Sequence, residues 1–149
     1  MSSPILIFAN GLSGGGLAPY LISKLENDPT IHFVKLPQEA TTFQNTYKEL
    51  LKDQSLRCLV AGGDGSVNWA VELLSDYFKN SETPPPPLAV LPLGTGNDMS
   101  RALGWGNGTK KSRIDNISKD LQLIRGSTHI ENVDRWKVTF QRTDTNEIK

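Results

Sequence analysis

The turn Gly62-Gly63-Asp64-Gly65-Ser66 separates two different hydrophobic patterns, and it restricts the possible folds more than any other feature of the chain. Residues 56–61 before it are mostly apolar, as in a buried strand. The residues after it place apolar side chains on one face of a helix, at Val67, Ala70, Val71, Leu74 and Phe78. A strand that turns through glycines into a helix leaves free N–H groups, and these, with the helix dipole, favour an anionic phosphate.

Asp64 is the unexpected member of this turn. A carboxylate repels a phosphate unless a metal ion or a transferable proton lies between them, so Asp64 indicates phosphoryl chemistry rather than passive phosphate binding. The structural alternative is an aspartate that only caps the turn. A glycine turn by itself is also common in α/β domains for purely structural reasons.

Two further segments repeat the order strand, polar glycine turn and helix. The first is a strand at 5–9, a turn at 10–16 and a helix from about Leu17. The second is a strand at 88–91, a turn at 92–98 and a short helix at 99–103. Because the carboxyl ends of parallel strands meet at one edge of a sheet, the three turns are expected to converge on one crevice. Three polar glycine turns at one edge are difficult to explain by packing alone.

The rest of the chain continues the alternation of strands and helices. The pattern predicts a strand at 31–36, a helix over about 43–51, a proline-rich linker at 80–87, a polar loop at 105–113, a helix over 114–124 and an extended strand at 128–140. We therefore predict one domain of the α/β class, with a mostly parallel, Rossmann-like sheet in three α/β/α layers. The three tryptophans are expected to be packing residues.

Composition excludes several classes of function. The net charge is +0 over 149 residues, so a broad basic surface for nucleic acid is not expected. The lone cysteine, Cys58, lies in the middle of a strand and is expected to be a buried thiol in a reducing compartment. No apolar segment approaches the ~20 residues of a transmembrane helix. Residues 1–4 lead directly into a core strand, which leaves no room for a signal peptide and indicates a cytoplasmic protein.

Together, the three turns resemble the catalytic domain of diacylglycerol kinases, whose superfamily also contains sphingosine, ceramide and NAD kinases. Residues 10–16 resemble the family's Asn-Pro-x-Ser-Gly-Gly loop, with Gly11 in place of proline, and residues 62–65 match its Gly-Gly-Asp-Gly signature. Residues 91–98 with 101–106 are similar to the eukaryotic diacylglycerol kinases in particular, and Asp134-Arg135-Trp136 resembles the family's Asp-Arg-Trp near the end of this lobe. The departures are Ser66 for threonine and Met99-Ser100 for Leu-Ala.

The resemblance implies a phosphofructokinase-like sheet and transfer of the γ-phosphoryl group of ATP, with Mg²⁺, to diacylglycerol at a membrane surface, giving phosphatidic acid. It implies a two-lobed enzyme, in which residues 1–140 are the nucleotide-binding lobe and residues 141–149 lead to a second lobe. A chain that holds only the first lobe is expected to bind nucleotide without turnover.

The resemblance also assigns roles to individual residues. Asp64 would be catalytic, either orienting Mg²⁺ or accepting the substrate proton, and Asp98 would be a second metal ligand, although a carboxylate in the first turn of a helix also suits the dipole alone. The residues that would bind the nucleotide are Asn10, Ser13, Gly14, Gly62, Gly63, Gly65, Ser66, Thr95 and Asn97. For Asn10, Ser13 and Gly14, in the first glycine turn, simple helix capping is the alternative.

Two other functions remain open. One is a sphingosine or ceramide kinase, against which the turn at 94–98 and Trp105-Gly106 argue. The other is a nucleotide-binding module without catalysis, against which the intact Asp64 argues.

Overall fold

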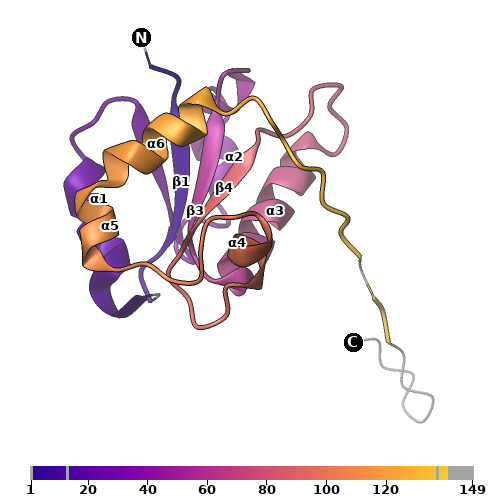
Figure 1. Ribbon diagram of the computed structural model, residues 1–149. Coiled ribbons are helices and arrows are strands. Elements are labelled where there is room, and N and C mark those ends of the chain that lie inside the picture. Colours follow the sequence, from indigo (N-terminus) through magenta and orange to yellow (C-terminus); the bar gives the residue numbers. More distant parts are fainter. Residues whose placement is uncertain (1, 13, 137, 141–149) are drawn as a thin grey trace.

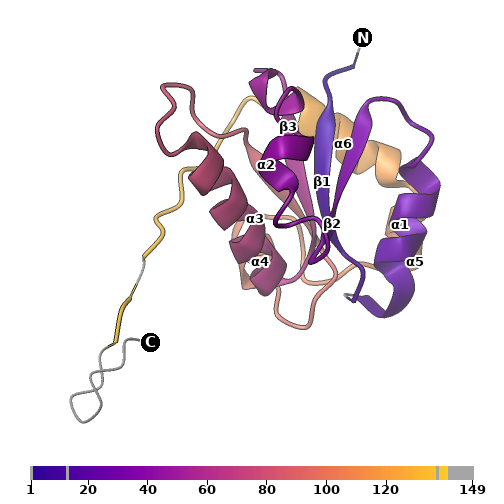
Figure 2. The ribbon, with the colours of Figure 1, turned by 180° about the vertical axis from the view of Figure 1, so that it is seen from behind.

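The computed structural model describes residues 2–12, 14–136 and 138–140. In this part of the chain four parallel strands, β1 (Ile5–Asn10), β2 (Ile31–Leu36), β3 (Arg57–Gly62) and β4 (Leu88–Pro92), form one sheet in the order β2-β1-β3-β4. Figure 1 shows β1, β3 and β4 in the centre of the molecule, and Figure 2 shows β2 beside β1. The predicted parallel sheet is confirmed.

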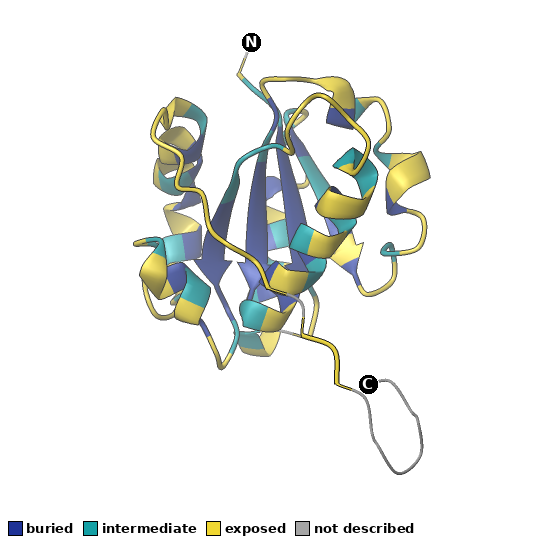
Figure 3. Cartoon of the chain, turned by 90° about the vertical axis from the view of Figure 1, so that its right-hand side faces the viewer, coloured by how far each residue is buried: buried dark blue, intermediate teal, exposed yellow. Residues whose placement is uncertain are grey.

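Both faces of the sheet are buried, which explains why the strands are almost continuously apolar. Along β1, Ile5 and Ile7 belong to one core cluster, whereas Leu6 and Phe8 belong to the other. Figure 3 shows the strands as a buried centre between more exposed helices. Cys58 is fully buried in β3, as predicted, and this burial raises the pKa of its thiol.

Helices cover each face, so the three α/β/α layers are confirmed. One face packs against α1 (Leu17–Leu25), α5 (Lys111–Asp115) and α6 (Ile117–Gly126). The other face packs against α2 (Phe43–Thr46), the 3₁₀ turn η2 (Leu50–Lys52) and α3 (Asp64–Phe78), which Figure 2 shows from behind. The remaining elements are the 3₁₀ turn η1 (Gly14–Gly16) and α4 (Asp98–Ala102).

Two predicted helices are interrupted. The helix expected over 43–51 is divided into α2 and η2, and it breaks at Tyr47 after a stretch that contains Asn45 and Thr46, which are weak helix formers. The helix expected over 114–124 begins earlier, at Lys111, so the loop expected at 105–113 is shorter. It also breaks at Asn116, whose side-chain amide donates back to the Ser112 carbonyl oxygen at 2.9 Å.

The strand predicted at 128–140 is wrong for the described residues of that range, none of which lies in a strand. Their apolar side chains are exposed, and Trp136 is 85% exposed, so its predicted packing role is also wrong. An alternating apolar pattern needs a neighbouring strand, and no described residue pairs with this segment. Arg135 holds the segment beside α3, with Nη2 at 3.3 Å from Asn68 Oδ1 and 3.5 Å from Glu72 Oε1.

The order of the strands creates a switch point between β1 and β3. The chain passes from β1 to β2 on one side and then returns to place β3 on the other side of β1. The two strands end together, because Ala9 is paired with Ala61. In an open parallel sheet, ligands bind outside the carboxyl ends of the strands at such a point. The turns after β1 and β3 are therefore where a site is expected.

Candidate active site

The three glycine turns enclose one hollow of about 760 Å³ at the carboxyl edge of the sheet. Its walls come from the turns that follow β1, β3 and β4, as the sequence predicted. Seven of the predicted site residues line it, together with Leu12, Gly15, Trp69, Leu93, Gly94 and Gly96. The seven are Asn10, Gly14, Gly63, Asp64, Gly65, Ser66 and Thr95.

The first turn depends on glycines in the left-handed region of the backbone. Gly14, Gly15 and Gly16 have φ values of 71°, 56° and 96°, which other residues rarely adopt. Asn10 fixes the start of this turn, because its Oδ1 accepts the Leu12 N–H at 3.0 Å. Asn10 Nδ2 also lies 3.5 Å from Ser66 Oγ, at the limit of a hydrogen bond, and so joins the first turn to the second. Ser13 lies outside the described residues.

The second and third turns are packed backbone against backbone. A Cβ built on Gly94 would lie 2.4 Å from the Gly63 Cα, and one built on Gly63 would lie 2.8 Å from the Gly96 oxygen. The Leu93 N–H donates to the Gly62 carbonyl at 3.1 Å, and the Asp64 N–H donates to the Gly96 carbonyl at 2.9 Å. Glycine is therefore needed at 63 and 94 for contact between the turns.

Gly65 differs from these two glycines. A Cβ on Gly65 would have no heavy atom of the described residues within 4 Å, and Gly65 lies in the first turn of α3. The backbone at Gly65 is therefore open to the hollow. Ser66 follows it and is largely buried, with its hydroxyl facing Asn10. This arrangement of an open helix N-terminus and a glycine suits an anionic group.

Asp64 is held by the backbone of the next turn. Its Oδ2 accepts the Asp98 N–H at 2.9 Å, and its Oδ1 accepts the Met99 N–H at 3.0 Å. Asp64 therefore has the capping role that the sequence left open. The structure that it caps is not its own turn but helix α4, which begins 34 residues later. Each carboxylate oxygen retains a second lone pair, so these bonds leave a metal or proton role untested.

Gly62, Asn97 and Asp98 do not line the hollow. Gly62 is buried at the end of β3. Asn97 is only 9% exposed, and its Nδ2 donates to the carbonyl oxygens of Gly94 and Asn107, each at 2.7 Å. Asp98 points outward and pairs with Arg101. Direct contacts of these three residues with a nucleotide or a metal remain predictions.

The residues that line the hollow would supply only part of a magnesium site. Among the described residues, no group of three or more His, Cys, Asp or Glu side chains could hold a metal ion. Mg²⁺ is commonly held by one or two carboxylates with water and substrate phosphates. Asp64 is the carboxylate in the lining that could take part in such a site.

Three apolar residues in the lining, Leu12, Trp69 and Leu93, were not predicted. Leu12 is highly exposed, whereas Trp69 also packs on the core beneath α3. The signal for Trp69 was its position one helical turn after Ser66, which places both residues on one side of α3. Only its place within the first turn pointed to Leu12.

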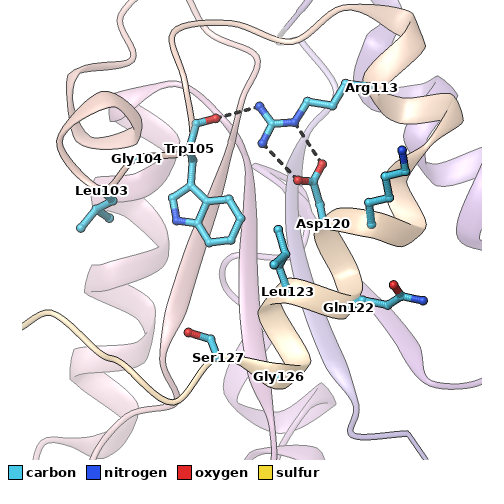
Figure 4. Close-up of a pocket in the computed structure, with 10 residues that line it drawn as sticks. Leu103, Gly104, Trp105, Arg113, Asp120, Gln122, Leu123, Gly126 and Ser127 are labelled. Carbon is cyan, nitrogen blue, oxygen red and sulfur yellow. Dashed lines mark hydrogen bonds and ion pairs between the residues drawn. The ribbon is translucent and has the colours of Figure 1, made fainter.

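A second hollow, of about 800 Å³, lies between α6 and the loop that follows α4 (Figure 4). Its apolar residues are Leu103, Trp105 and Leu123. Arg113 lies at its border, where Nη1 donates to the Trp105 carbonyl at 2.7 Å and Nε contacts Asp120 Oδ2 at 3.0 Å. The second hollow shares no lining residue with the hollow at the glycine turns and belongs to the α5–α6 region.

Comparison with known proteins agrees with the geometry. The family model "Diacylglycerol kinase catalytic domain" matches residues 4–126. Diacylglycerol kinase 2 of Arabidopsis thaliana is 36% identical over an alignment of 149 positions that covers 95% of this chain and 20% of that protein. Eye-specific diacylglycerol kinase of Drosophila melanogaster is 35% identical over 145 aligned positions, with coverage of 95% of this chain and 9% of that protein. Human diacylglycerol kinase zeta is 34% identical over 140 aligned positions, with coverage of 91% of this chain and 14% of that protein.

A solved structure from Bacillus anthracis str. Sterne, assigned to the diacylglycerol kinases, has the same fold, with a TM-score of 0.54 and 24% identity. The match covers 83% of this chain and 39% of that structure. This chain therefore spans only a minor part of the relatives it matches. No helix in the described part of the chain is both long and apolar enough to cross a membrane. The match over residues 4–126 shows that the chain belongs to the diacylglycerol kinase catalytic-domain family.

Proposed function

We propose that this chain forms the ATP-binding lobe of a lipid kinase that phosphorylates the primary hydroxyl of diacylglycerol, giving phosphatidic acid. The observation that carries the proposal is the single hollow at the switch point, which is lined by all three glycine turns. The names of the relatives supply the substrate class. The lipid would be met at a membrane surface by a peripheral, cytoplasmic protein.

The phosphates of ATP would lie against the N-terminus of α3. Gly63 and Gly65, which line the hollow, would supply backbone N–H groups there, and the Ser66 hydroxyl lies beside Asn10. Gly14 and Thr95 would border the nucleotide from the two neighbouring turns. Asp64, with Asp98 as a second ligand, would help to hold Mg²⁺, whose charge would offset that of the phosphates.

The proposal includes a second lobe that follows residue 140 and completes the acceptor site. Its support is the small share of the relatives that this chain covers. A chain with the first lobe alone would bind ATP and release it unchanged. A full-length protein that binds nucleotide but phosphorylates no lipid would instead favour a non-catalytic nucleotide-binding module.

Gly65→Asp in the full-length protein tests the position of the phosphates. The new carboxylate has space in the fold, but it places negative charge where phosphate must approach the backbone. We expect diacylglycerol phosphorylation to fall at least about 100-fold, because electrostatic stabilisation at such a site typically contributes that much. The melting temperature should change little.

Gly108→Asp is the matched control. Gly108 is exposed, a Cβ there would have no heavy atom of the described residues within 4 Å, and it lies outside the hollow. The control adds the same charge to the same protein and should retain activity. If Gly65→Asp retained activity as well, the phosphates would not be bound by this turn.

A further inference from the structure

Helix α4 begins without a cap from its own N-terminal residue. Asn97 occupies the N-cap position, with φ −134° and ψ 40°, and among the described residues its side chain makes no cap hydrogen bond. Its Nδ2 instead donates to the carbonyl oxygens of Gly94 and Asn107, and its Oδ1 is buried without a hydrogen-bond partner among the described residues. The first N–H groups of α4 therefore need an acceptor from another part of the chain.

Asp64 supplies that acceptor. Its two carboxylate oxygens accept the N–H groups of Asp98 and Met99, the first two residues of α4. A carboxylate at a helix N-terminus is favoured both by the open donors and by the dipole. Asp64 lies at the start of α3, so its side chain connects the N-termini of two helices that are far apart in the sequence.

The backbone of Asp64 holds the same turn from its other side. The Asp64 N–H donates to the Gly96 carbonyl at 2.9 Å, while Gly63 and Gly94 are in close backbone contact. The segment from Gly94 to Met99 is thus fixed to the second turn at three places. Thr95, which lines the hollow, lies inside this fixed segment.

We propose that Asp64 is a positioning residue, whose carboxylate sets the third glycine turn against the second before any ligand binds. The cap itself is independent of the function proposed above, whereas its effect on nucleotide affinity rests on that function. This role differs from a proton acceptor, which would not alter nucleotide binding. It also differs from a metal ligand, which would matter only when the metal is present.

The first test observes the Met99 amide in protein labelled with ¹⁵N-methionine. This sequence has two methionines, and Met1 is the first residue, so Met99 supplies the internal methionine amide. Its signal is assigned by its loss in Met99→Leu. Asp64→Asn keeps the size of the side chain but replaces one acceptor oxygen with an NH₂ group. We expect hydrogen exchange of the Met99 amide, without ligand, to be about tenfold faster, as for loss of a charged cap.

Asp76→Asn is the matched control for this measurement. Asp76 is exposed near the other end of α3, so the substitution removes a carboxylate from the same helix without touching α4. Exchange of the Met99 amide should not change in this variant. An unchanged exchange rate in Asp64→Asn as well would overturn the proposal.

The second test compares ADP binding with Mg²⁺ and with a chelator. A positioning role predicts that Asp64→Asn weakens ADP binding about tenfold with the chelator, where loss of a metal ligand has no effect, and at least as much with Mg²⁺. If ADP binding weakens only with Mg²⁺, or does not weaken at all, the proposed effect of the Asp64 cap on nucleotide affinity is wrong. If the wild-type protein binds no ADP, the proposed function fails, and the Met99 amide still decides whether Asp64 caps α4.

A second pair of variants keeps the Asp64 charge in place, in case Asp64→Asn does not fold. Asp98→Pro removes the N–H that Asp64 Oδ2 accepts, at the first helical position, where proline is tolerated. Asp98→Ala removes the same carboxylate but retains that N–H. The proposal predicts faster Met99 exchange in the proline variant than in the alanine variant, and equal exchange in the two would overturn it.

Discussion

The glycines around the hollow perform two different tasks, although the sequence presents them as one motif. Gly63 and Gly94 allow two backbones to touch, because a Cβ on either residue would fall within 3 Å of the opposite turn. At Gly65 a Cβ would meet only open space, so this glycine is not required by packing. A glycine that packing does not need, beside a helix N-terminus, is where a ligand is expected to approach the backbone.

Alanine substitutions should separate these tasks. We expect Gly94→Ala to lower the free energy of unfolding by about 3 kcal/mol, because its Cβ would lie 2.4 Å from the Gly63 Cα and backbone must move. Gly65→Ala should be neutral or stabilising by up to about 1 kcal/mol, because alanine is the better residue in a helix. Urea unfolding followed by circular dichroism measures both. Similar losses in the two variants would contradict the distinction.

Most of the hollow could be predicted from the sequence. Parallel strands end at one edge of the sheet, so the turns that carry Asn10, Asp64, Gly65 and Thr95 were expected to meet there. Sequence reasoning could not predict that the Asn97 amide points inward to two carbonyl groups, because the direction of a side chain depends on the loop at 104–109. Nor could the sequence show that the donors to the Asp64 carboxylate are N–H groups of α4, which begins 34 residues later.

Arg113 organises the region where α5, α6 and the loop after α4 meet. Its guanidinium contacts the Asp120 carboxylate of α6 and the Trp105 carbonyl of the loop. The two charged side chains are only 26% and 17% exposed, so solvent screens this pair less than an ordinary surface pair. Arg113 therefore ties the loop beside the third turn to the helical layer of α1, α5 and α6.

Arg113→Gln should destabilise the fold. The variant leaves Asp120 without its cationic partner in a partly buried place, and we expect a loss of about 2 kcal/mol in the free energy of unfolding. Lys52→Gln provides the comparison, because the Lys52–Glu49 pair is highly exposed and its removal should leave stability unchanged within error. Chemical denaturation measures both variants, and equal effects would show that the Arg113 contacts add nothing.

The strands and the long helix α3 could be predicted because their apolar patterns are continuous. The interrupted helices could not be, since their apolar spacing passes through the breaks at Tyr47 and Asn116, where weak helix formers or a side-chain bond to the backbone end the helix locally. The segment at 128–140 failed for a different reason. Its alternating pattern describes a half-buried strand, but a strand also requires a partner.

The described residues of the segment at 128–140 present apolar side chains to solvent. Ile130, Val133, Trp136, Val138 and Phe140 are all more than half exposed. Large exposed apolar residues in a group commonly mark a surface that another part of a protein covers. This chain covers at most 20% of the length of each of the three named relatives, so the rest of a longer protein is a source for such a cover.

Comparison of residues 1–149 with the longer protein tests this view. We expect the 149-residue chain to bind ADP but to phosphorylate diacylglycerol at least about 100-fold more slowly than the full-length protein, because an acceptor site without its second lobe neither orients the lipid hydroxyl nor excludes water. Robust lipid phosphorylation by the short chain would overturn the two-lobe proposal.

Trp136 provides a structural measurement that does not depend on activity. In the 149-residue chain its fluorescence, taken as the difference between wild type and Trp136→Phe, should be readily quenched by acrylamide, because the indole is 85% exposed. In the full-length protein the same difference should be shielded, because the apolar segment would be covered. Trp105→Phe is the control, since Trp105 is already partly buried against the core and its quenching should be similar in both lengths. Equal quenching of Trp136 in both proteins would mean that the segment stays in solvent, and its apolar residues would then need a partner outside the chain.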